Sequence, residues 1–269
     1  GLEGLEAELD LGAGALHPTA QALPIAFDKA GLRLSYDAPR GRIELTDLRI
    51  ESPSLRLKAT GQSYLLDQND DILTGTLGAK VPAGFLGQVA IREVAIDPEG
   101  LFERPLRFTE GAMDARLRLD PFRLDIGQIS LIEERGRRLS LKGHATAVPE
   151  GWGVALDLAL DSIAHDRLLQ LWPRTLIPGT RAWLGENVAQ GLLSNVHAAL
   201  RISPGTDPRV YLGYEFDEAE VRFLRTLPPI RNGRGRSSLD GKTYLIALDH
   251  GRIDAPLGGE INVAGSVFK

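Results

Sequence analysis

Residues 115–126 read Ala-Arg-Leu-Arg-Leu-Asp-Pro-Phe-Arg-Leu-Asp-Ile. Apolar side chains occupy every second position in each half of this stretch, and charged side chains fill most of the positions between them. Successive side chains of a β-strand point to opposite faces of its sheet. This period of two therefore predicts strands that bury one face and expose the other to water.

The same alternation dominates the chain from residue 30 to residue 160 and returns after residue 192. Further runs of this kind lie at 43–50, 55–59, 139–141, 154–160, 196–202, 211–216, 220–224 and 244–248. Because glycine and proline separate the runs, sequence neighbours are expected to pair as an antiparallel meander. The shift of the apolar pattern across Asp47 predicts a β-bulge.

Two turns are predicted late in the chain. Asn232-Gly233 follows the break at Pro228-Pro229. Asp240-Gly241 stands between two apolar runs and predicts a two-residue hairpin turn, with a positive φ at both positions.

The pattern changes to helical spacing in one segment. Asp161-Ser162 is a capping signal for a helix from Ile163 to Leu171, and Pro178 fits the first turn of a second helix. Gly191 is expected as the left-handed residue after that helix. The predicted organisation is an antiparallel meander at 1–161, a two-helix insert at 162–191, and strands at 192–269 that continue the same sheet.

The composition limits the class of protein. The 269 residues are 43% hydrophobic and 25% charged, which is typical of a globular chain. A net charge of −5 gives no basic field for nucleic acid, so none is expected as a partner. The absence of cysteine excludes disulfides and thiolate metal sites, and it suits an oxidising compartment.

Targeting and membrane signals are weak. The chain has no run of 18 apolar residues, and its first residues are acidic where a signal peptide is basic. The alternating run at 261–269 indicates a strand that continues, so we expect a fragment of a longer protein.

Motifs for nucleotide chemistry are incomplete. Gly241-Lys242-Thr243 has the end of a phosphate-binding loop, but Arg236 stands where that loop needs glycine. A hairpin turn is the preferred interpretation. No Gly-x-Ser-x-Gly or Gly-x-Gly-x-x-Gly motif occurs.

Metal motifs are equally incomplete. Asp67, Asn69 and Asp71 match the opening of a calcium loop, but Ile72 replaces its required glycine, so an acidic surface turn is preferred. His17, His144, His165, His197 and His250 lack ligand spacing and are expected at the surface or its rim. We expect no metal, no cofactor and no enzyme activity, although a converging carboxylate pair of a hydrolase stays an open alternative.

Two stretches resemble a known family. The first comprises Leu168-Leu169-Gln170-Leu171-Trp172-Pro173, Pro178-Gly179-Thr180-Arg181-Ala182-Trp183-Leu184, Asn187-Val188 and Gln190-Gly191. The second comprises Val221-Arg222-Phe223-Leu224, Leu227-Pro228-Pro229-Ile230, Gly233-Arg234-Gly235, Leu239-Asp240-Gly241 and Gly251-Arg252-Ile253. They resemble the helical insert and the following strands of AsmA-like envelope proteins, the group containing TamB and YhdP, and are most similar to the YhdP-like branch.

The resemblance implies a fold and a function. Such proteins are inner-membrane-anchored and span the periplasm of Gram-negative cells, where a long twisted antiparallel sheet curls into an open groove. They are linked to phospholipid transport towards the outer membrane. The expected partners here are phospholipid acyl chains, with other envelope proteins as further partners, in the periplasm. Membrane anchoring is expected only through segments absent from this chain.

Groove residues follow from the alternation. The expected lining is Leu55, Leu57, Leu117, Leu119, Leu124, Ile126, Leu139, Leu141, Val154, Leu156, Leu158, Leu160, Val196, Leu200, Ile246 and Leu248. A helical plug or cover is expected from Leu168, Trp172, Trp183, Leu184 and Val188. Period two shows that a face is buried but not what covers it, so a closed β-sandwich serving as an envelope scaffold is the alternative.

Overall fold

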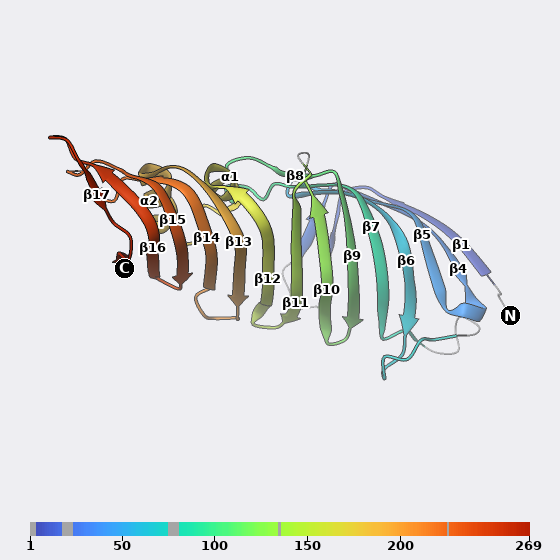
Figure 1. The fold of residues 1–269 in the computed structure, drawn as a ribbon. Helices are drawn as coiled ribbons and strands as arrows, with labels where there is room; N and C mark the ends of the chain where they lie inside the picture. Colours follow the sequence, from blue (N-terminus) through green and yellow to red (C-terminus); the bar gives the residue numbers. More distant parts are fainter. Residues whose placement is uncertain (1–3, 18–23, 75–80, 134–135, 225) are drawn as a thin grey trace. The chain divides into compact units, whose positions relative to one another are not determined.

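The computed structural model describes the chain except for residues 1–3, 18–23, 75–80, 134–135 and 225. Sixteen strands form one antiparallel sheet, in which most neighbours in space are neighbours in sequence, and a separate two-stranded hairpin accompanies it (Figure 1). β1 and β17 stand at the two ends of the strand order, so the sheet is open in the described residues. The predicted mainly β, antiparallel fold with a two-helix insert is confirmed.

The element bounds follow the chain. The first half supplies β1 (Gly4–Leu11), β2 (Gly14–Leu16), β3 (Ile25–Phe27), β4 (Lys29–Asp37), the 3-10 helix η1 (Ala38–Arg40), β5 (Arg42–Glu51), β6 (Leu55–Leu66), β7 (Gly84–Ile96), β8 (Leu106–Phe108), β9 (Glu110–Leu119), β10 (Phe122–Ile132) and β11 (Arg138–Val148). The second half supplies β12 (Gly151–Ala164), α1 (His165–Leu171), α2 (Pro178–Asn187), β13 (Val188–Ile202), β14 (Arg209–Val221), β15 (Ile230–Asp240), β16 (Thr243–Asp254), β17 (Glu260–Asn262) and β18 (Val267–Phe268).

The chain divides into two compact units. Unit 1 comprises residues 1–99, 105–156 and 201–208. Unit 2 comprises residues 100–104, 157–200 and 209–269, and it contains both α-helices.

Register irregularities cross the strands of unit 1 near their middles. The predicted bulge at Asp47 is confirmed by a shift between Leu45 and Leu48 in the pairing of β5 with β6. Similar shifts occur at the β4–β5, β6–β7, β9–β10 and β10–β11 pairings. Because a bulge bends its strand and increases its twist, this series of bulges favours a curved sheet.

Unit 1 has a compact cluster at one end of its strands. Tyr36, Ala38 and Leu65 are buried there, and Leu73 packs against them from the loop after β6. Gly41 has a φ of 60°, and an added Cβ would lie 1.8 Å from the carbonyl oxygen of Leu73. A side chain at this position would displace the loop from the cluster.

The core of unit 2 lies on one face of its strands. Leu239 is fully buried, and it pairs with Leu212 on one side and Tyr244 on the other. Val196 of β13 and Leu184 of α2 are also buried. These buried side chains therefore come from the strands of unit 2 and from a helix.

The helical insert begins later than the capping signal predicts. Asp161 and Ser162 lie in β12, and α1 starts at His165 without a side-chain cap. The predicted cap is wrong because the strand pairing continues through these residues. Gly191 lies inside β13 without a positive φ, so its predicted role as a helix end is also wrong.

The late turns also differ from their predictions. Asp240 pairs with Thr243, so Gly241 and Lys242 form the hairpin turn and only Gly241 has a positive φ. Asn232-Gly233 lies inside β15, where Asn232 has a φ of 50° next to a register shift, and is a bulge rather than a turn. The predicted strand at 220–224 continues β14 only to Val221.

Candidate functional site

Unit 1 carries a continuous apolar face across its strands. One row of directly paired residues runs Ala7, Leu34, Leu45, Gly61, Val89, Met113, Ile129 and Leu141, from β1 to β11. The next row runs Leu9, Leu32, Leu48, Ala59, Ile91, Gly111, Leu131 and Leu139. Every member of both rows is apolar or glycine, so strand pairing aligns the apolar positions into unbroken stripes.

The opposite face of unit 1 is polar. One of its rows runs Glu44, Gln62, Gln88, Asp114 and Gln128. Apart from the main sheet, the regular elements described in unit 1 are the β2–β3 hairpin and η1. Within the described part of unit 1, no second large sheet therefore packs against the apolar face.

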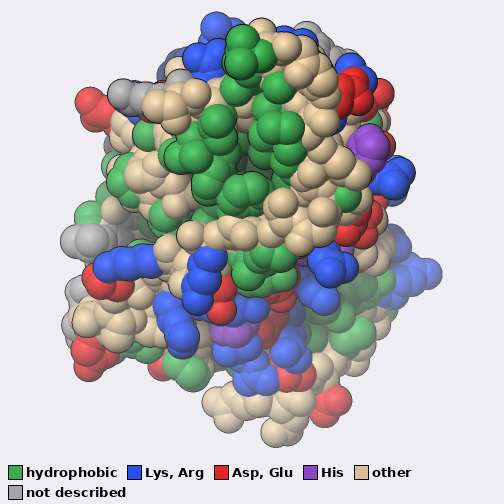
Figure 2. Space-filling model, turned by 60° about the vertical axis from the view of Figure 1, so that its left-hand side comes forward, with side chains coloured by type: hydrophobic (Ala, Val, Ile, Leu, Met, Phe, Trp, Pro, Cys, Tyr) green, Lys and Arg blue, Asp and Glu red, His purple; other side chains and the backbone are tan. Residues whose placement is uncertain are grey.

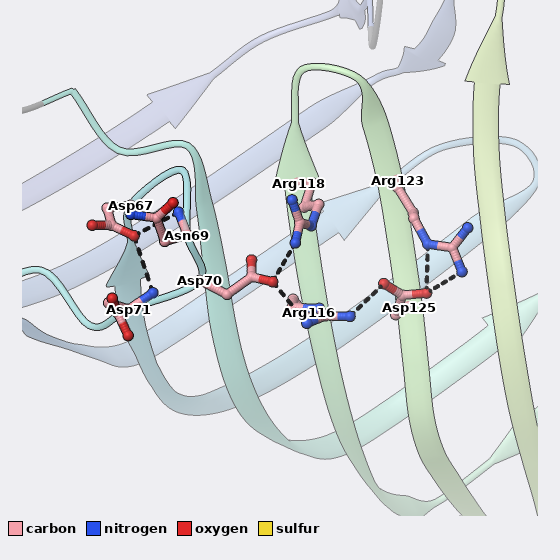
Figure 3. Close-up of polar contacts among 8 residues, drawn as sticks. All are labelled: Asp67, Asn69, Asp70, Asp71, Arg116, Arg118, Arg123 and Asp125. Atoms are coloured by element: carbon pink, nitrogen blue, oxygen red, sulfur yellow. Dashed lines mark hydrogen bonds and ion pairs between the residues drawn. The ribbon is translucent and has the colours of Figure 1, made fainter.

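An ion-pair network on β9 and β10 holds the loop after β6 (Figure 3). Asp70 points from this loop to Arg116, at 3.1 Å, and to Arg118. Arg116 also contacts Asp125 at 3.2 Å, and Arg123 donates to Asp125 at 2.7 Å. These hydrogen bonds, the one from Arg123 first, hold the pKa of Asp125 below its usual value.

The acidic residues of the same loop form a turn. One carboxylate oxygen of Asp67 accepts hydrogen bonds from the backbone N–H groups of Asn69, at 2.8 Å, and Asp71, at 3.1 Å. This is an Asx-type turn, so the prediction of a surface turn is confirmed. The described residues contain no group of three or more His, Asp or Glu side chains placed to hold a metal ion.

Unit 2 contains an apolar cavity between its helices and its strands. The cavity has a volume of about 40 Å³. Its lining comprises His165, Trp183, Leu184, Val188, Gly191, Leu193, Tyr214, Phe216, Ala219, Val221, Phe223, Ile230, Gly233, Tyr244, Ile246, Leu248 and Phe268. Figure 2 brings the C-terminal end forward and shows hydrophobic side chains gathered around a hollow there.

The imidazole of His165 and the hydroxyl groups of Tyr214 and Tyr244, which line this cavity, are hydrogen-bonded. His165 Nε2 lies 3.2 Å from the carbonyl oxygen of Leu184, and the hydroxyl groups of Tyr214 and Tyr244 are 2.5 Å apart. Ser237, which pairs with Tyr214 across the strands, donates to the Leu245 carbonyl at 3.0 Å. An occupant of the cavity would therefore find apolar surface and few free hydrogen-bonding groups.

Three of these groups have shifted pKa values, and burial raises the pKa of Tyr244 as well as that of Tyr214. Burial lowers the pKa of His165, opposed by its hydrogen bond to the Leu184 carbonyl and by the charge of Asp166. Burial raises the pKa of Tyr214 well above its usual value, reinforced by Tyr244. All three side chains are thus held in their neutral forms.

The predicted lining residues share one face in unit 1. Those on β6, β9, β10 and β11 are Leu55, Leu57, Leu117, Leu119, Leu124, Ile126, Leu139 and Leu141, and each pairs with apolar or glycine partners. Gly143 approaches Leu156 of β12 closely, because a Cβ there would lie 3.0 Å from the Leu156 Cα. Val154 is half-buried on the same strand.

The remaining residues predicted to line the groove or to form the plug lie in unit 2, and only some of them line the cavity. Ile246 and Leu248 line the cavity, as do Trp183, Leu184 and Val188 of the expected plug. Leu160, Val196, Leu168 and Trp172 are buried outside the cavity lining, whereas Leu158 and Leu200 are half-buried. The structure therefore brings only part of the expected plug to the cavity.

Sequence reasoning missed the aromatic character of this cavity. Tyr214, Phe216, Tyr244, Phe223 and Phe268 all line it. Their signal was present as alternation in the strands at 211–216 and 244–248, but a low overall aromatic content of 6% concealed their convergence. The prediction that every histidine lies at the surface or its rim is wrong for His165, which is buried.

Neither α-helix of the described chain has the length and hydropathy of a transmembrane span.

Gly241-Lys242-Thr243 belongs to the β15–β16 hairpin, as expected for a turn rather than a phosphate loop. Searches of protein-family models, of curated proteins and of solved structures found no match to this chain.

Proposed function

We propose that this chain shields the acyl chains of phospholipids on the apolar face of its sheet. The observation that supports this most is the pair of apolar rows that cross unit 1 without interruption. At the edge of the sheet, Leu5, Leu9 and Leu11 of β1 are 44%, 47% and 42% exposed. In the second row, Ala59, Ile91, Leu131 and Leu139 are already buried, whereas most side chains of the first row are half-buried. Hydrocarbon from outside the chain would therefore cover the first row and the edge, where water otherwise contacts apolar surface.

Continuity of the rows suits transport better than storage. Each methylene that leaves water stabilises the bound state by about 0.8 kcal/mol, wherever along the rows it lies. An acyl chain can then move from one strand to the next, because no single position binds it much more tightly than its neighbours. The aliphatic side chains of the rows make a smooth surface without a selective pocket.

The cavity of unit 2 supports the same class of ligand. Its lining is dominated by aliphatic and aromatic side chains, and its hydroxyl and imidazole groups are already hydrogen-bonded. A hydrocarbon tail has no hydrogen-bond donors or acceptors, whereas a peptide segment would bury unpaired backbone groups.

The resemblance to AsmA-like proteins gives this binding a biological setting. The sheet and the two-helix insert are of the kind that the resemblance implies. We therefore propose that the chain lies in the periplasm, as a segment of an inner-membrane-anchored protein that conducts phospholipid between the inner and outer membranes.

A pair of neighbouring substitutions tests the proposal. Leu141 lies in an apolar row, and Ser140 precedes it on the opposite face. The chain is purified from Gram-negative cells, whose envelope supplies phospholipid, and the lipid extracted from it is measured by mass spectrometry. We expect phospholipid with the natural chain and with Ser140→Asp, and its loss with Leu141→Asp, because a carboxylate in the row must keep its water.

The same experiment can contradict the proposal. Circular dichroism and urea unfolding must show that Leu141→Asp retains its sheet. Absence of phospholipid from the natural chain, or equal lipid in both variants, would rule out shielding by this face.

The free edge of the sheet favours a second candidate, an envelope scaffold. β1 pairs only with β4 in the described residues, so its other edge can accept an extended segment of a partner protein. A scaffold of this kind would carry no lipid and would be insensitive to Leu141→Asp.

A further inference from the structure

The cover of the unit 2 cavity is α2, a helix with few stabilising features of its own. Arg181 connects it to Glu103, at 2.6 Å, and to the Leu169 carbonyl of α1, at 3.0 Å. α2 contains two glycines, has no side-chain cap at its N-terminus, and carries no acidic residue in its first turn. Glycine costs about 1 kcal/mol relative to alanine within a helix, and a missing cap costs about as much. Packing against the rest of unit 2, rather than helix propensity, therefore holds α2 in place.

Backbone strain lies at the start of this helix. Ile177, the residue before Pro178, has a φ of 47° and a ψ of 58°. The other non-glycine residues with a positive φ in the described chain are all Asp, Asn or Glu. A β-branched side chain is strongly disfavoured in the left-handed region. If Ile177 left this conformation, the strain would be relieved and the backbone would enter α2 in a different direction.

Trp183 is the α2 residue whose indole ring lines the cavity. Its ring lies 6.2 Å from that of Phe223 and 6.3 Å from that of Tyr244, edge-on to both. The remaining cavity of about 40 Å³ has room for only a few water-sized molecules. Among the lining residues, Trp183 has the largest side chain, and movement of one short helix would withdraw it.

The walls opposite Trp183 belong to paired strands. Tyr214, Phe216 and Tyr244 lie on β14 and β16, which are held by the ladders through β15. Phe223 follows β14 and packs against Phe268, with ring centroids 4.1 Å apart and the rings tilted by 45°. Removal of the indole would therefore leave an aromatic slot whose strand walls are fixed by their pairing.

We propose that Trp183 is an exchangeable plug, and that a single hydrocarbon tail takes its place when α2 moves away about Ile177. This inference rests on the proposed function, because it names what one part of the apolar surface binds and what limits access. The occupant is a tail rather than a peptide, since the lining is mainly apolar and its imidazole and hydroxyl groups are already hydrogen-bonded, which would leave a peptide backbone unpaired.

The rate of tail binding tests the plug. The probe is cis-parinaric acid, whose fluorescence rises in apolar surroundings, and it is mixed with the full chain in a stopped-flow instrument. Trp183→Ala is expected to accelerate association several-fold and to raise affinity, because the slot is then already open. Leu192→Ala, at an exposed position of β13 in the same unit, is the matched control and should leave both unchanged.

Tryptophan emission gives a second, independent measure. In the double variant Trp152→Phe/Trp172→Phe, Trp183 is the remaining tryptophan. Tail binding should shift its emission to the red, because the indole leaves apolar surroundings for water. A wall residue would instead shift to the blue as the tail covers it.

The outcomes separate the plug from the proposed function. Slower or unchanged binding by Trp183→Ala, or a blue shift, overturns the plug while tail binding itself stands. If neither the natural chain nor Trp183→Ala binds the probe, the plug and the proposed function both fail.

Discussion

Single glycines in the apolar face permit strands to approach closely. A Cβ on Gly61 would lie 2.3 Å from the carbonyl oxygen of Gln88 in the neighbouring strand β7. Gly127 of β10 is a natural comparison, because a Cβ there would meet its nearest atom at an ordinary 3.5 Å.

This difference predicts unequal costs of the same substitution. Gly61→Ala should lower the free energy of unfolding by about 2 kcal/mol, since the β6–β7 ladder must shift to admit the methyl group. Gly127→Ala should change it by much less. Urea unfolding of both variants measures the difference, and equal effects would show that β6 and β7 do not approach as closely as described.

His165 predicts a pH dependence of stability. Its folded-state pKa is depressed by burial, so the unfolded chain binds the proton more tightly. The stabilising effect of neutral His165 is complete above its unfolded pKa of about 6.5 and is lost as the pH falls below that value. The free energy of unfolding should therefore decrease between pH 6.5 and pH 5.5, by at most about 1.4 kcal/mol per pH unit.

A matched pair of variants isolates this histidine. His165→Gln cannot take up the proton and should flatten the dependence, whereas His197→Gln, at an exposed position of β13, should retain it. Chemical unfolding at a series of pH values makes the comparison. A profile unchanged by His165→Gln would contradict the assigned role of burial.

The sequence predicts which face of a strand a residue occupies, but not which residues from distant segments meet in the folded chain. The position of Leu141 in an apolar row follows directly from alternation, because the face of a strand residue depends on local register. The burial of His165 does not, because it depends on how α1 and α2 pack. The meeting of Trp183 with Phe223 depends on a helix and on the segment after another strand, which no local pattern connects.

At the scale of elements, the loop after β6 is held by its ion pairs. Asp70→Asn should lower the free energy of unfolding by about 1 kcal/mol, because the carboxylate contacts both Arg116 and Arg118 at a partly exposed site. The loss should shrink in high salt, which screens such pairs. Asp71→Asn removes a neighbouring exposed charge and should have little effect. Equal losses from the two variants in urea unfolding would contradict this assignment.

Strands were predictable as elements because their period is local, but their ends and turns were not. The hairpin at Gly241 was expected from its glycine, yet pairing of Asp240 with Thr243 moved the turn by one residue. Asn232-Gly233 has turn chemistry but lies in a continuous strand, where a bulge uses the same positive φ. Asp161-Ser162 has capping chemistry, and strand pairing overrode it.

At the scale of the whole molecule, the sheet separates its two faces throughout unit 1. Apolar rows on one face and polar rows on the other arise from the same pairings, so strand register alone determines both. The fold class was therefore predictable from sequence. What covers the apolar face was not, because alternation reports burial but not the partner.

The central claim is that phospholipid tails lie on the apolar face, and a pair of labelled chains tests it most directly. The sequence contains no cysteine, so Val89→Cys and Gln88→Cys each introduce one labelling site on adjacent residues that face opposite sides of β7. Each variant is labelled with a polarity-sensitive fluorophore and mixed with phospholipid vesicles. The account predicts a blue shift for the label at position 89 and little change at position 88. No shift at position 89, or an equal shift at both positions, would contradict it.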